Sequence, residues 1–245
     1  MHNQSMSIDY SIIIPAYNEE DYLEKTLIAL KEAMTSLPLK GEIIVVDNNS
    51  SDRTAEIAKQ HEATVIFEAI NQISRARNAG AKNAQGKYLI FVDADTIIPT
   101  ALLQQALNNL ESRRIIGGGA SVSGDVPLQG LQKRLLSLWN WISVKTNNAA
   151  GSFVYCYRDD FETVGGFSES VYASEEIWFS GKLRKLAKSR NQSFCIIETP
   201  PVITSMRKLQ WYSPAQIYLY TMMLMLFPFI VRIKSLCMLW YRRPS

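Results

Sequence analysis

Two aspartates follow directly on an apolar run near the middle of the sequence. The run Tyr88–Val92 has the continuous apolar pattern of a strand buried on both faces, and Asp93 and Asp95 come just after it. Open α/β sheets bind ligands at the carboxyl ends of their strands. Two carboxylates held one residue apart suit a hard divalent cation that also binds phosphate oxygens. The pattern predicts a metal-assisted site for a phosphorylated substrate, although the same aspartates could simply end the strand before a helix that follows Pro99.

The residues before these aspartates alternate between strand patterns and helix patterns. Apolar, β-branched runs at Tyr10–Ala16, Glu42–Val46 and Ala63–Phe67 predict strands, and a helical pattern covers Asn71–Ala84. Strands that alternate with helices of about ten to fifteen residues predict a parallel sheet with right-handed crossovers. Because the carboxyl ends of parallel strands meet at one edge, the polar residues that follow the strands should converge there. These residues are Asn18, Glu19, Asp47, Asp93 and Asp95.

The sequence after the aspartates predicts more strands and helices of the same domain. Gly117–Asp125 and Gly151–Tyr157 have strand patterns, and Leu128–Ile142 has the pattern of an amphipathic helix with two tryptophans. At 245 residues with 47% hydrophobic content, the chain can bury one large core. We therefore expect one α/β domain at residues 8–205, built on an open, mostly parallel sheet flanked by helices.

The C-terminal part, residues 206–245, is both basic and apolar. Residues 199–245 hold six basic and no acidic side chains, whereas residues 1–198 hold 20 basic and 23 acidic side chains. As a helix, the uncharged run Ile217–Val231 reaches only about 22 Å, short of the roughly 30 Å of a bilayer core. A longer span would bury Arg232 and Lys234 at a cost of about 2.5 to 3.5 kcal/mol each. We predict a helical tail that lies on the membrane surface, with packing on the domain or on a second subunit as the alternative.

The cysteines and the N-terminus bear on the compartment. Cys156, Cys195 and Cys237 have neither a metal-ligand spacing nor an even disulfide set, which favours a reducing compartment. The first residues contain no apolar signal-peptide core. We expect a cytoplasmic protein whose candidate site faces the inner side of the membrane, and we expect no nucleic-acid partner.

Four segments of the sequence together resemble the successive motifs of one enzyme family. They are SIIIPAYNEE (11–20), VVDNNSSDRT (45–54), SRARNAGAKNAQGKYLIFVDADT (74–96) and GGFSESVYASEEIWFSGKL (165–183). In type, order and spacing they resemble glycosyltransferase family 2, whose members are inverting enzymes of the GT-A fold. The resemblance implies a GT-A-like fold, a nucleotide-diphosphate sugar as donor, a hydroxyl acceptor, and Mg²⁺ or Mn²⁺ as cofactor.

The resemblance also implies roles for individual residues. The positions that it assigns to donor binding are Pro15, Ala16, Tyr17, Glu19, Asp47, Arg77 and Asp93. Asp47 would bind the base, Arg77 would lie beside the diphosphate, and Asp95 would hold the metal. Sugar transfer expels a diphosphate, so a cation and a guanidinium would stabilise the developing charge. Taken alone, Arg77 could equally be a solvated charge on a polar helix face.

The pair Glu175 and Glu176 is implied to include the catalytic base. Glu176 stands where the family usually has an aspartate, so it is one methylene longer and the choice between the two glutamates stays open. An inverting displacement needs a base that takes the proton of the acceptor hydroxyl. Both glutamates begin a helical pattern whose apolar positions include Phe179 and Leu183, and acidic residues also favour helix starts because of the macrodipole.

The sequence thus predicts a metal-dependent inverting glycosyltransferase at the cytoplasmic membrane face, and the tail favours a lipid-linked hydroxyl acceptor. One alternative is a sugar nucleotidyltransferase, which also combines an α/β sheet with paired carboxylates and Mg²⁺. That class would carry a glycine-rich, basic phosphate loop after the first strand, where this chain has Pro15-Ala16-Tyr17. The other alternative is a catalytically inactive nucleotide-sugar-binding protein, which Glu176 in place of an aspartate keeps open.

Overall fold

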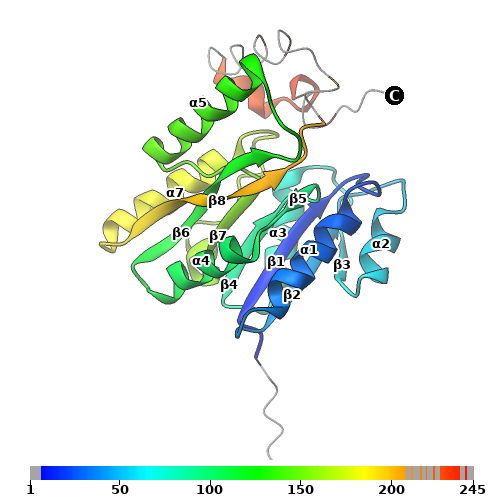
Figure 1. Cartoon of the computed structure of the whole chain (residues 1–245), viewed down its shortest axis with the longest axis horizontal. Coiled ribbons are helices and arrows are strands. Elements are labelled where there is room, and N and C mark those ends of the chain that lie inside the picture. Colours follow the sequence, from blue (N-terminus) through cyan, green and yellow to red (C-terminus); the bar gives the residue numbers. More distant parts are fainter. Residues whose placement is uncertain are drawn as a thin grey trace, which may run out of the picture.

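The computed structural model describes residues 7–207, 211, 216, 219, 223, 227–237 and 241. In this part of the chain, eight strands form one sheet in the order β3-β2-β1-β4-β7-β6-β8-β5, with helices on both faces (Figure 1). The predicted α/β class is confirmed. Four of the seven strand pairings are parallel, so the sheet is mostly parallel by a narrow margin.

The first half of the sheet is entirely parallel. It contains β1 (Tyr10–Ala16), β2 (Gly41–Asp47), β3 (Thr64–Phe67) and β4 (Tyr88–Val92). The connecting helices are α1 (Leu23–Thr35), α2 (Thr54–Gln60) and α3 (Ile73–Asn83). Every residue of β1 and β4 is buried, because helices cover both faces of these central strands. The parallel direction places the carboxyl ends of β1, β2 and β4 at one edge.

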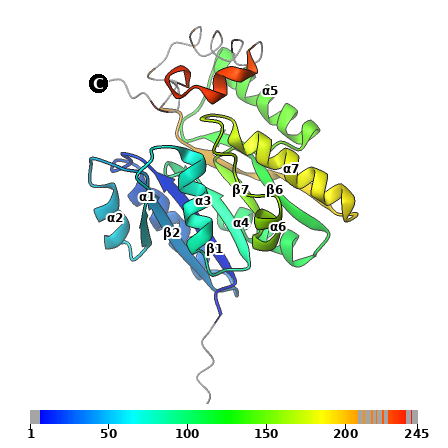
Figure 2. The ribbon, with the colours of Figure 1, turned by 180° about the vertical axis from the view of Figure 1, so that it is seen from behind.

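The two faces of the sheet hold separate apolar cores. α1, α2 and α4 (Thr100–Glu111) cover one face, where they pack against alternate residues of β1 such as Ile12 and Ile14. α3, α6 (Arg158–Thr163) and α7 (Glu175–Ser189) cover the other face, where they pack against Ile13 (Figure 2). The alternation of β1 residues between the two cores follows from the two-residue period of a strand.

The second half of the sheet mixes strand directions. It contains β5 (Thr96–Ile97), β6 (Ile115–Gly124), β7 (Phe153–Tyr157) and β8 (Ser193–Thr204), and α5 (Gly130–Thr146) follows β6. β7 runs antiparallel to both β4 and β6, and β8 runs parallel to β6. β8 therefore ends at the same edge as β4. The sequence did not predict β5, which is two residues long, or β8, because Pro200 and Pro201 argue against a strand.

The C-terminal residues that the structure describes pack on the domain. They form two short 3₁₀ turns, η1 (Pro228–Arg232) and η2 (Lys234–Leu236). The backbone N–H of Tyr172 donates to the carbonyl of Val231 at 2.6 Å, and Cys237 is fully buried. Within the described residues, no helix has the length and apolarity needed to cross a bilayer. Most of the predicted apolar helix Ile217–Val231 lies outside the described residues, and the membrane contact of the tail stays a prediction.

The close packing of α3 on the sheet predicts the effect of one substitution. A Cβ at Gly80 would lie 2.3 Å from Cγ2 of Ile13 and 3.0 Å from Cγ2 of Val46. Overpacking costs about 1–3 kcal/mol, more than the roughly 1 kcal/mol that a helix gains when alanine replaces glycine. Gly80→Ala should therefore lower the free energy of unfolding by about 1–2 kcal/mol in equilibrium urea denaturation.

The matched control is Gly181→Ala in α7. There the nearest atom to a new Cβ is Nη2 of Arg184 at 3.9 Å, so the alanine fits and should leave stability equal or slightly higher. Equal stability of the two variants would contradict the close contact between α3 and β1.

Candidate active site

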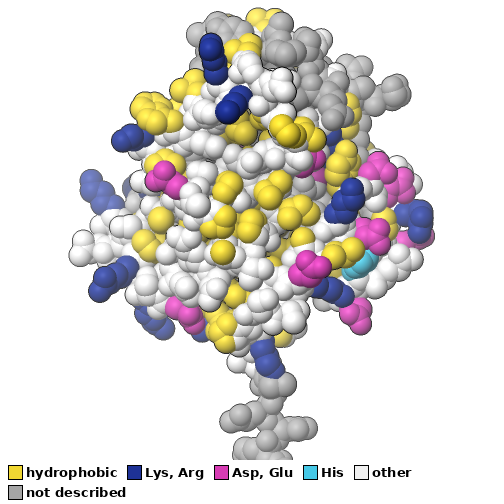
Figure 3. Space-filling model, in the orientation of Figure 1, with side chains coloured by type: hydrophobic (Ala, Val, Ile, Leu, Met, Phe, Trp, Pro, Cys, Tyr) yellow, Lys and Arg dark blue, Asp and Glu magenta, His cyan; other side chains and the backbone are white. Residues whose placement is uncertain are grey.

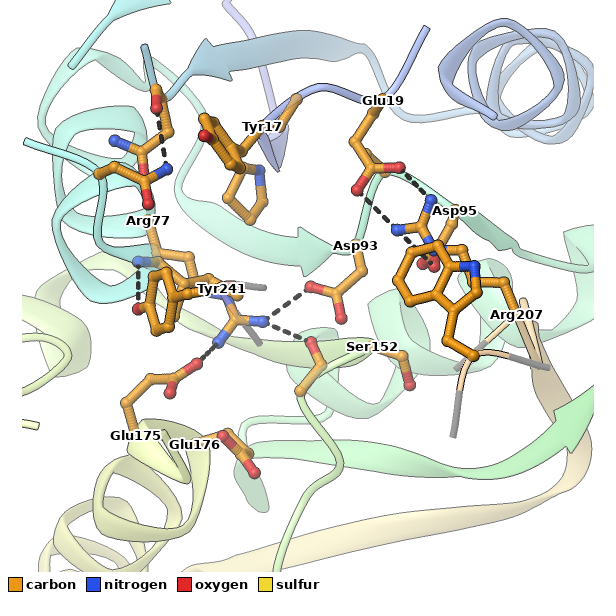
Figure 4. Close-up of a pocket in the computed structure, with 18 residues that line it drawn as sticks. Tyr17, Glu19, Arg77, Asp93, Asp95, Ser152, Glu175, Glu176, Arg207 and Tyr241 are labelled. Carbon is orange, nitrogen blue, oxygen red and sulfur yellow. Dashed lines mark hydrogen bonds and ion pairs between the residues drawn. The ribbon is translucent and has the colours of Figure 1, made fainter. Parts of the chain in front are cut away.

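A pocket opens at the edge where β1 and β4 end (Figure 4). The pocket and its open mouth together comprise about 1030 Å³, a volume that includes open solvent. Its lining comes from the ends of β1 and β4, from α3, from the residues before β7, from the start of α7 and from the C-terminal part. The lining residues are Pro15, Ala16, Tyr17, Glu19, Asn48, Asn71, Ile73, Arg77, Asp93, Ala94, Asp95, Gly151, Ser152, Glu175, Glu176, Arg207, Trp211 and Tyr241.

Nine of the ten predicted site residues line this one pocket. They are Pro15, Ala16, Tyr17, Glu19, Arg77, Asp93, Asp95, Glu175 and Glu176. Asp47 is the exception, because its carboxylate accepts the backbone N–H of Ser50 at 2.9 Å and shapes the loop after β2. The next residue, Asn48, lines the pocket instead. The roles that the sequence suggests for these residues stay predictions, but their convergence is a property of the fold.

Arg77 is the buried centre of this pocket. Its side chain is 1% exposed, Nη1 donates to Oε1 of Glu175 at 2.5 Å, and Nη2 donates to Oδ1 of Asp93 at 2.8 Å. Nη2 also donates to the carbonyl of Gly151 at 2.8 Å. Burial opposes the charge, but the two carboxylates outweigh it and raise the pKa of Arg77, so the guanidinium stays charged. The alternative of a solvated surface charge does not hold for this arginine.

The two glutamates at the start of α7 have different surroundings. Both line the pocket, but Glu175 is 2% exposed and is bound to Arg77, whereas Glu176 is only partly buried. Burial first, and then the neighbouring charge of Glu175, together raise the pKa of Glu176 to about 8 against the opposing charge of Arg77. A carboxyl group with this pKa is mostly protonated at neutral pH and can accept a proton in mildly alkaline solution. The geometry thus separates a glutamate that orients Arg77 from one that can exchange a proton with a ligand.

Arg207 is a pocket residue that the sequence interpretation missed. Its Nη1 and Nη2 donate to the two carboxylate oxygens of Glu19 at 2.7 and 2.6 Å, and Nη2 lies 3.1 Å from Oδ2 of Asp95. Although burial opposes it, the hydrogen bonds to Glu19 and the charge of Asp95 raise the pKa of Arg207. In sequence it belongs to the basic C-terminal part, residues 206–245. The missing signal was β8, since a residue just past the end of a strand at this edge faces the pocket.

Tyr241 also belongs to the pocket. Its hydroxyl accepts the backbone N–H of Ile73 at 3.4 Å, and burial raises its pKa. The amine of Lys234 donates to the carbonyl of Asn71 at 2.6 Å. These contacts attach the end of the tail to the loop before α3, so Lys234 and Tyr241 contact the domain rather than facing away from it.

The pocket holds more acidic than basic side chains, an excess that favours binding of a cation. Two arginines face the four carboxylates of Glu19, Asp93, Asp95 and Glu175, and the carboxyl group of Glu176 adds a fifth charge in alkaline solution. A bound diphosphate would add further negative charge. Among the described residues, no three acidic, histidine or cysteine side chains cluster closely enough to hold a metal by themselves. One or two carboxylates together with substrate phosphates is the usual arrangement for Mg²⁺, so Asp95 fits a cation that a phosphorylated ligand helps to bind.

Sequence comparison finds a matching family and several relatives described as glycosyltransferases. Residues 11–230 match the pattern of Glycosyl transferase family 2. Glycosyltransferase AglE of Haloferax volcanii is 29% identical over 178 residues, which is 68% of this chain and 58% of AglE. The uncharacterized glycosyltransferase EpsJ of Bacillus subtilis is 34% identical over 117 residues, which is 44% of this chain and 33% of EpsJ. The matched regions thus span only a third to about three fifths of these relatives.

Solved structures share the fold. TarS of S. aureus aligns with a TM-score of 0.63 at 20% identity, over 91% of this chain and 65% of that chain. The mannosyltransferase PcManGT from Pyrobaculum calidifontis, solved with GDP-Man and Mn²⁺, aligns with a TM-score of 0.65 at 19% identity, over 98% of this chain and 66% of that chain. This likeness confirms the predicted GT-A-like architecture.

The family match and the pocket coincide along the chain. The matched residues 11–230 include every pocket residue except Tyr241. They also include all of β2 to β8 and nearly all of β1, so the match covers the whole sheet. The match favours the glycosyltransferase prediction over the nucleotidyltransferase alternative. The chain belongs to glycosyltransferase family 2.

Proposed function

We propose that this protein transfers a glycosyl unit, with inversion, from a nucleotide-diphosphate sugar to a hydroxyl acceptor. The observation that carries the proposal is the convergence of Asp93, Asp95, Arg77 and Glu176 on one pocket at the carboxyl edge of the sheet. The family supports it, and so do the ligands of the structural neighbours. TarS has been solved with UDP and with UDP-GlcNAc, and PcManGT with GDP-Man.

The donor would bind with its diphosphate toward the aspartates and arginines. Asp95 would hold Mg²⁺ or Mn²⁺ together with the diphosphate, and the cation would supply positive charge to the leaving group. Arg77 keeps Asp93 in place through its 2.8 Å hydrogen bond. Pro15, Ala16 and Tyr17, at the end of β1, would flank the nucleoside. The chain thus holds the donor at a strand edge and leaves the sugar facing the start of α7.

Glu176 would act as the base. An inverting displacement needs one group that removes the proton of the attacking hydroxyl, and this group must lie in the pocket and be unprotonated when it acts. Glu176 lines the pocket, and its pKa of about 8 lets it take the proton in mildly alkaline solution. Glu175 is committed to Arg77 at 2.5 Å, so we assign it a positioning role.

The acceptor would be lipid-linked and would be reached at the cytoplasmic face of a membrane. Besides the basic tail, α5 supports this proposal. A stripe of exposed residues along α5 combines apolar and basic side chains, namely Leu131, Arg134, Leu138, Trp141 and Lys145. α5 contains no acidic residue, and hydrophobic and basic side chains alternate over it in Figure 3. This combination is typical of helices that lie on anionic lipid.

The position of α5 agrees with such a contact. Figures 1 and 2 both draw α5 and the described C-terminal residues at the end of the molecule toward which β1 and β4 point. Phe227 and Phe229 at that end are 48% and 59% exposed. A membrane on this side would bring a lipid-linked hydroxyl to the edge that carries the pocket.

The first test of the proposal compares the two glutamates. Glu176→Gln keeps the size of the side chain but cannot accept a proton, so turnover should fall about 10²-fold or more while donor affinity changes little. Release of nucleoside diphosphate from a panel of nucleotide sugars, with Mn²⁺ and a bacterial lipid extract as acceptor, measures the rate. Glu175→Gln is the control variant. If Glu175→Gln alone abolished turnover in a folded protein, the base would be assigned to the wrong glutamate.

The raised pKa of Glu176 also predicts how stability depends on pH. Because folding raises this pKa from 4.5 to about 8, the folded state binds the proton more tightly than the unfolded state between these two values. The contribution of Glu176 to stability therefore falls as the pH rises from about 4.5 to 8. Urea denaturation at pH 6 and pH 8.5 should show a larger loss of stability for the wild type than for Glu176→Gln. Equal losses would mean that Glu176 is not buried as described.

The membrane contact predicts that α5 variants lose lipid binding. Leu138→Gln/Trp141→Gln should weaken co-sedimentation with anionic liposomes at every salt concentration, because it removes apolar insertion. Arg134→Gln/Lys145→Gln should remove the salt-sensitive part, about 1 kcal/mol for each charge. Ile28→Gln/Phe67→Gln removes two exposed apolar side chains elsewhere and serves as control. Unchanged binding of both α5 variants would exclude this helix from the contact.

A further inference from the structure

The guanidinium of Arg207 contacts Asp95, the side chain that would hold the cation. It bridges the carboxylates of Glu19 and Asp95, at 2.6 and 2.7 Å from the first and 3.1 Å from the second (Figure 4). Glu19 comes from the loop after β1, Asp95 from the loop after β4, and Arg207 from the residues after β8. One positive group thus holds together two acidic side chains of the proposed donor site.

The two contacts of Arg207 differ in strength. The contact with Glu19 is bidentate, and paired hydrogen bonds of this kind are the strong ones. The contact with Asp95 is single and longer. The aromatic rings of Tyr22 and Trp211 lie 4.4 and 5.5 Å from the guanidinium carbon and hold it further. The contact with Asp95 is therefore the one that another cation can replace while Arg207 remains on Glu19.

Arg207 also keeps a donor for a phosphate. Its side chain is 8% exposed, and its Nε–H has no hydrogen-bond partner among the described residues. A guanidinium fork matches the oxygens of a phosphate group, which can accept two parallel hydrogen bonds. A diphosphate in the pocket would offer Arg207 more acceptors than the single oxygen of Asp95 does. The same ligand that needs the cation can thus draw Arg207 away from Asp95.

We propose that Arg207 competes with the divalent cation for Asp95, and that the diphosphate of the donor relieves this competition. The inference rests on the proposed function, because it takes Asp95 as the cation site. Without donor, Arg207 neutralises Asp95 and keeps the affinity for the cation low. With donor, the guanidinium pairs with the diphosphate and Asp95 binds the cation. By thermodynamic linkage, cation and diphosphate each raise the affinity for the other by the same factor.

The test measures Mn²⁺ binding to the full chain with and without UDP. The electron paramagnetic resonance signal of free Mn²⁺ reports how much of the metal remains unbound. The wild type should bind Mn²⁺ weakly alone and much more tightly with UDP. Arg207→Gln should bind Mn²⁺ without nucleotide about tenfold more tightly than the wild type, a typical size for such coupling. The further tightening by UDP should shrink in this variant. Arg207→Lys, which has a single charged donor, should lie between the two.

Two controls locate the effect. Arg75→Gln removes an arginine that pairs with Glu68 and Glu169 outside the pocket lining, and it should leave Mn²⁺ affinity unchanged. Asp95→Asn added to Arg207→Gln should abolish the tighter binding. Thermal unfolding checks that each variant is folded. If Arg207→Gln does not fold, the Mn²⁺ affinity of Arg207→Lys alone decides whether Arg207 competes with the cation.

The outcomes separate this inference from the proposed function. If Arg207→Gln and Arg207→Lys bind Mn²⁺ no more tightly than the wild type, while UDP still promotes Mn²⁺ binding, the competition is refuted and the metal-dependent donor site stands. Tight binding that persists in the double variant would likewise refute it, because the cation would then lie elsewhere. If no variant binds Mn²⁺ with or without UDP, the inference and the metal dependence of the proposed function both fail.

Discussion

The pocket depends on one buried guanidinium. A buried charge is tolerated only when it is paired and hydrogen-bonded, and Arg77 meets this condition with Asp93, Glu175 and the carbonyl of Gly151. These partners come from the end of β4, the start of α7 and the segment before β7. Removing one partner of a buried pair costs about 3–5 kcal/mol. The place of α7, and with it that of Glu176, is therefore tied to the strand end that carries the two aspartates.

The core beneath Arg77 strengthens this interaction. The phenylalanines at positions 91, 161, 167 and 179 pack together with ring centroids 4.4 to 6.5 Å apart. The guanidinium carbon of Arg77 lies 5.1 Å from the ring centroid of Phe167. A cluster of buried aromatic rings lowers the local dielectric, which strengthens ion pairs and disfavours an unpaired charge. The same burial that keeps Arg77 bound to Glu175 raises the pKa of Glu176.

A second arginine gives the other aspartate its partner. Arg77 holds Asp93 from inside the domain, whereas Arg207 contacts Asp95 from the residues that follow β8. The two aspartates are two positions apart in sequence, yet the arginines that pair with them are 130 positions apart. Asp93 is held in a network of three partners around Arg77, and Asp95 shares a guanidinium with Glu19. Because of this difference, Asp93 stays paired with Arg77, whereas Asp95 can exchange Arg207 for a metal cation, as proposed above.

The sequence by itself determined the elements whose pattern is local. The strands of the parallel half, the helices between them and the convergence of Glu19, Asp93 and Asp95 follow from apolar runs and from the rule that parallel strands end at one edge. Only the tertiary structure decided the partners of the charges. That Arg77 is buried, that Glu175 rather than Glu176 pairs with it, and that Arg207 belongs to the site all depend on β7 beginning and β8 ending at that edge. Such contacts join residues far apart in sequence, and no local period encodes them.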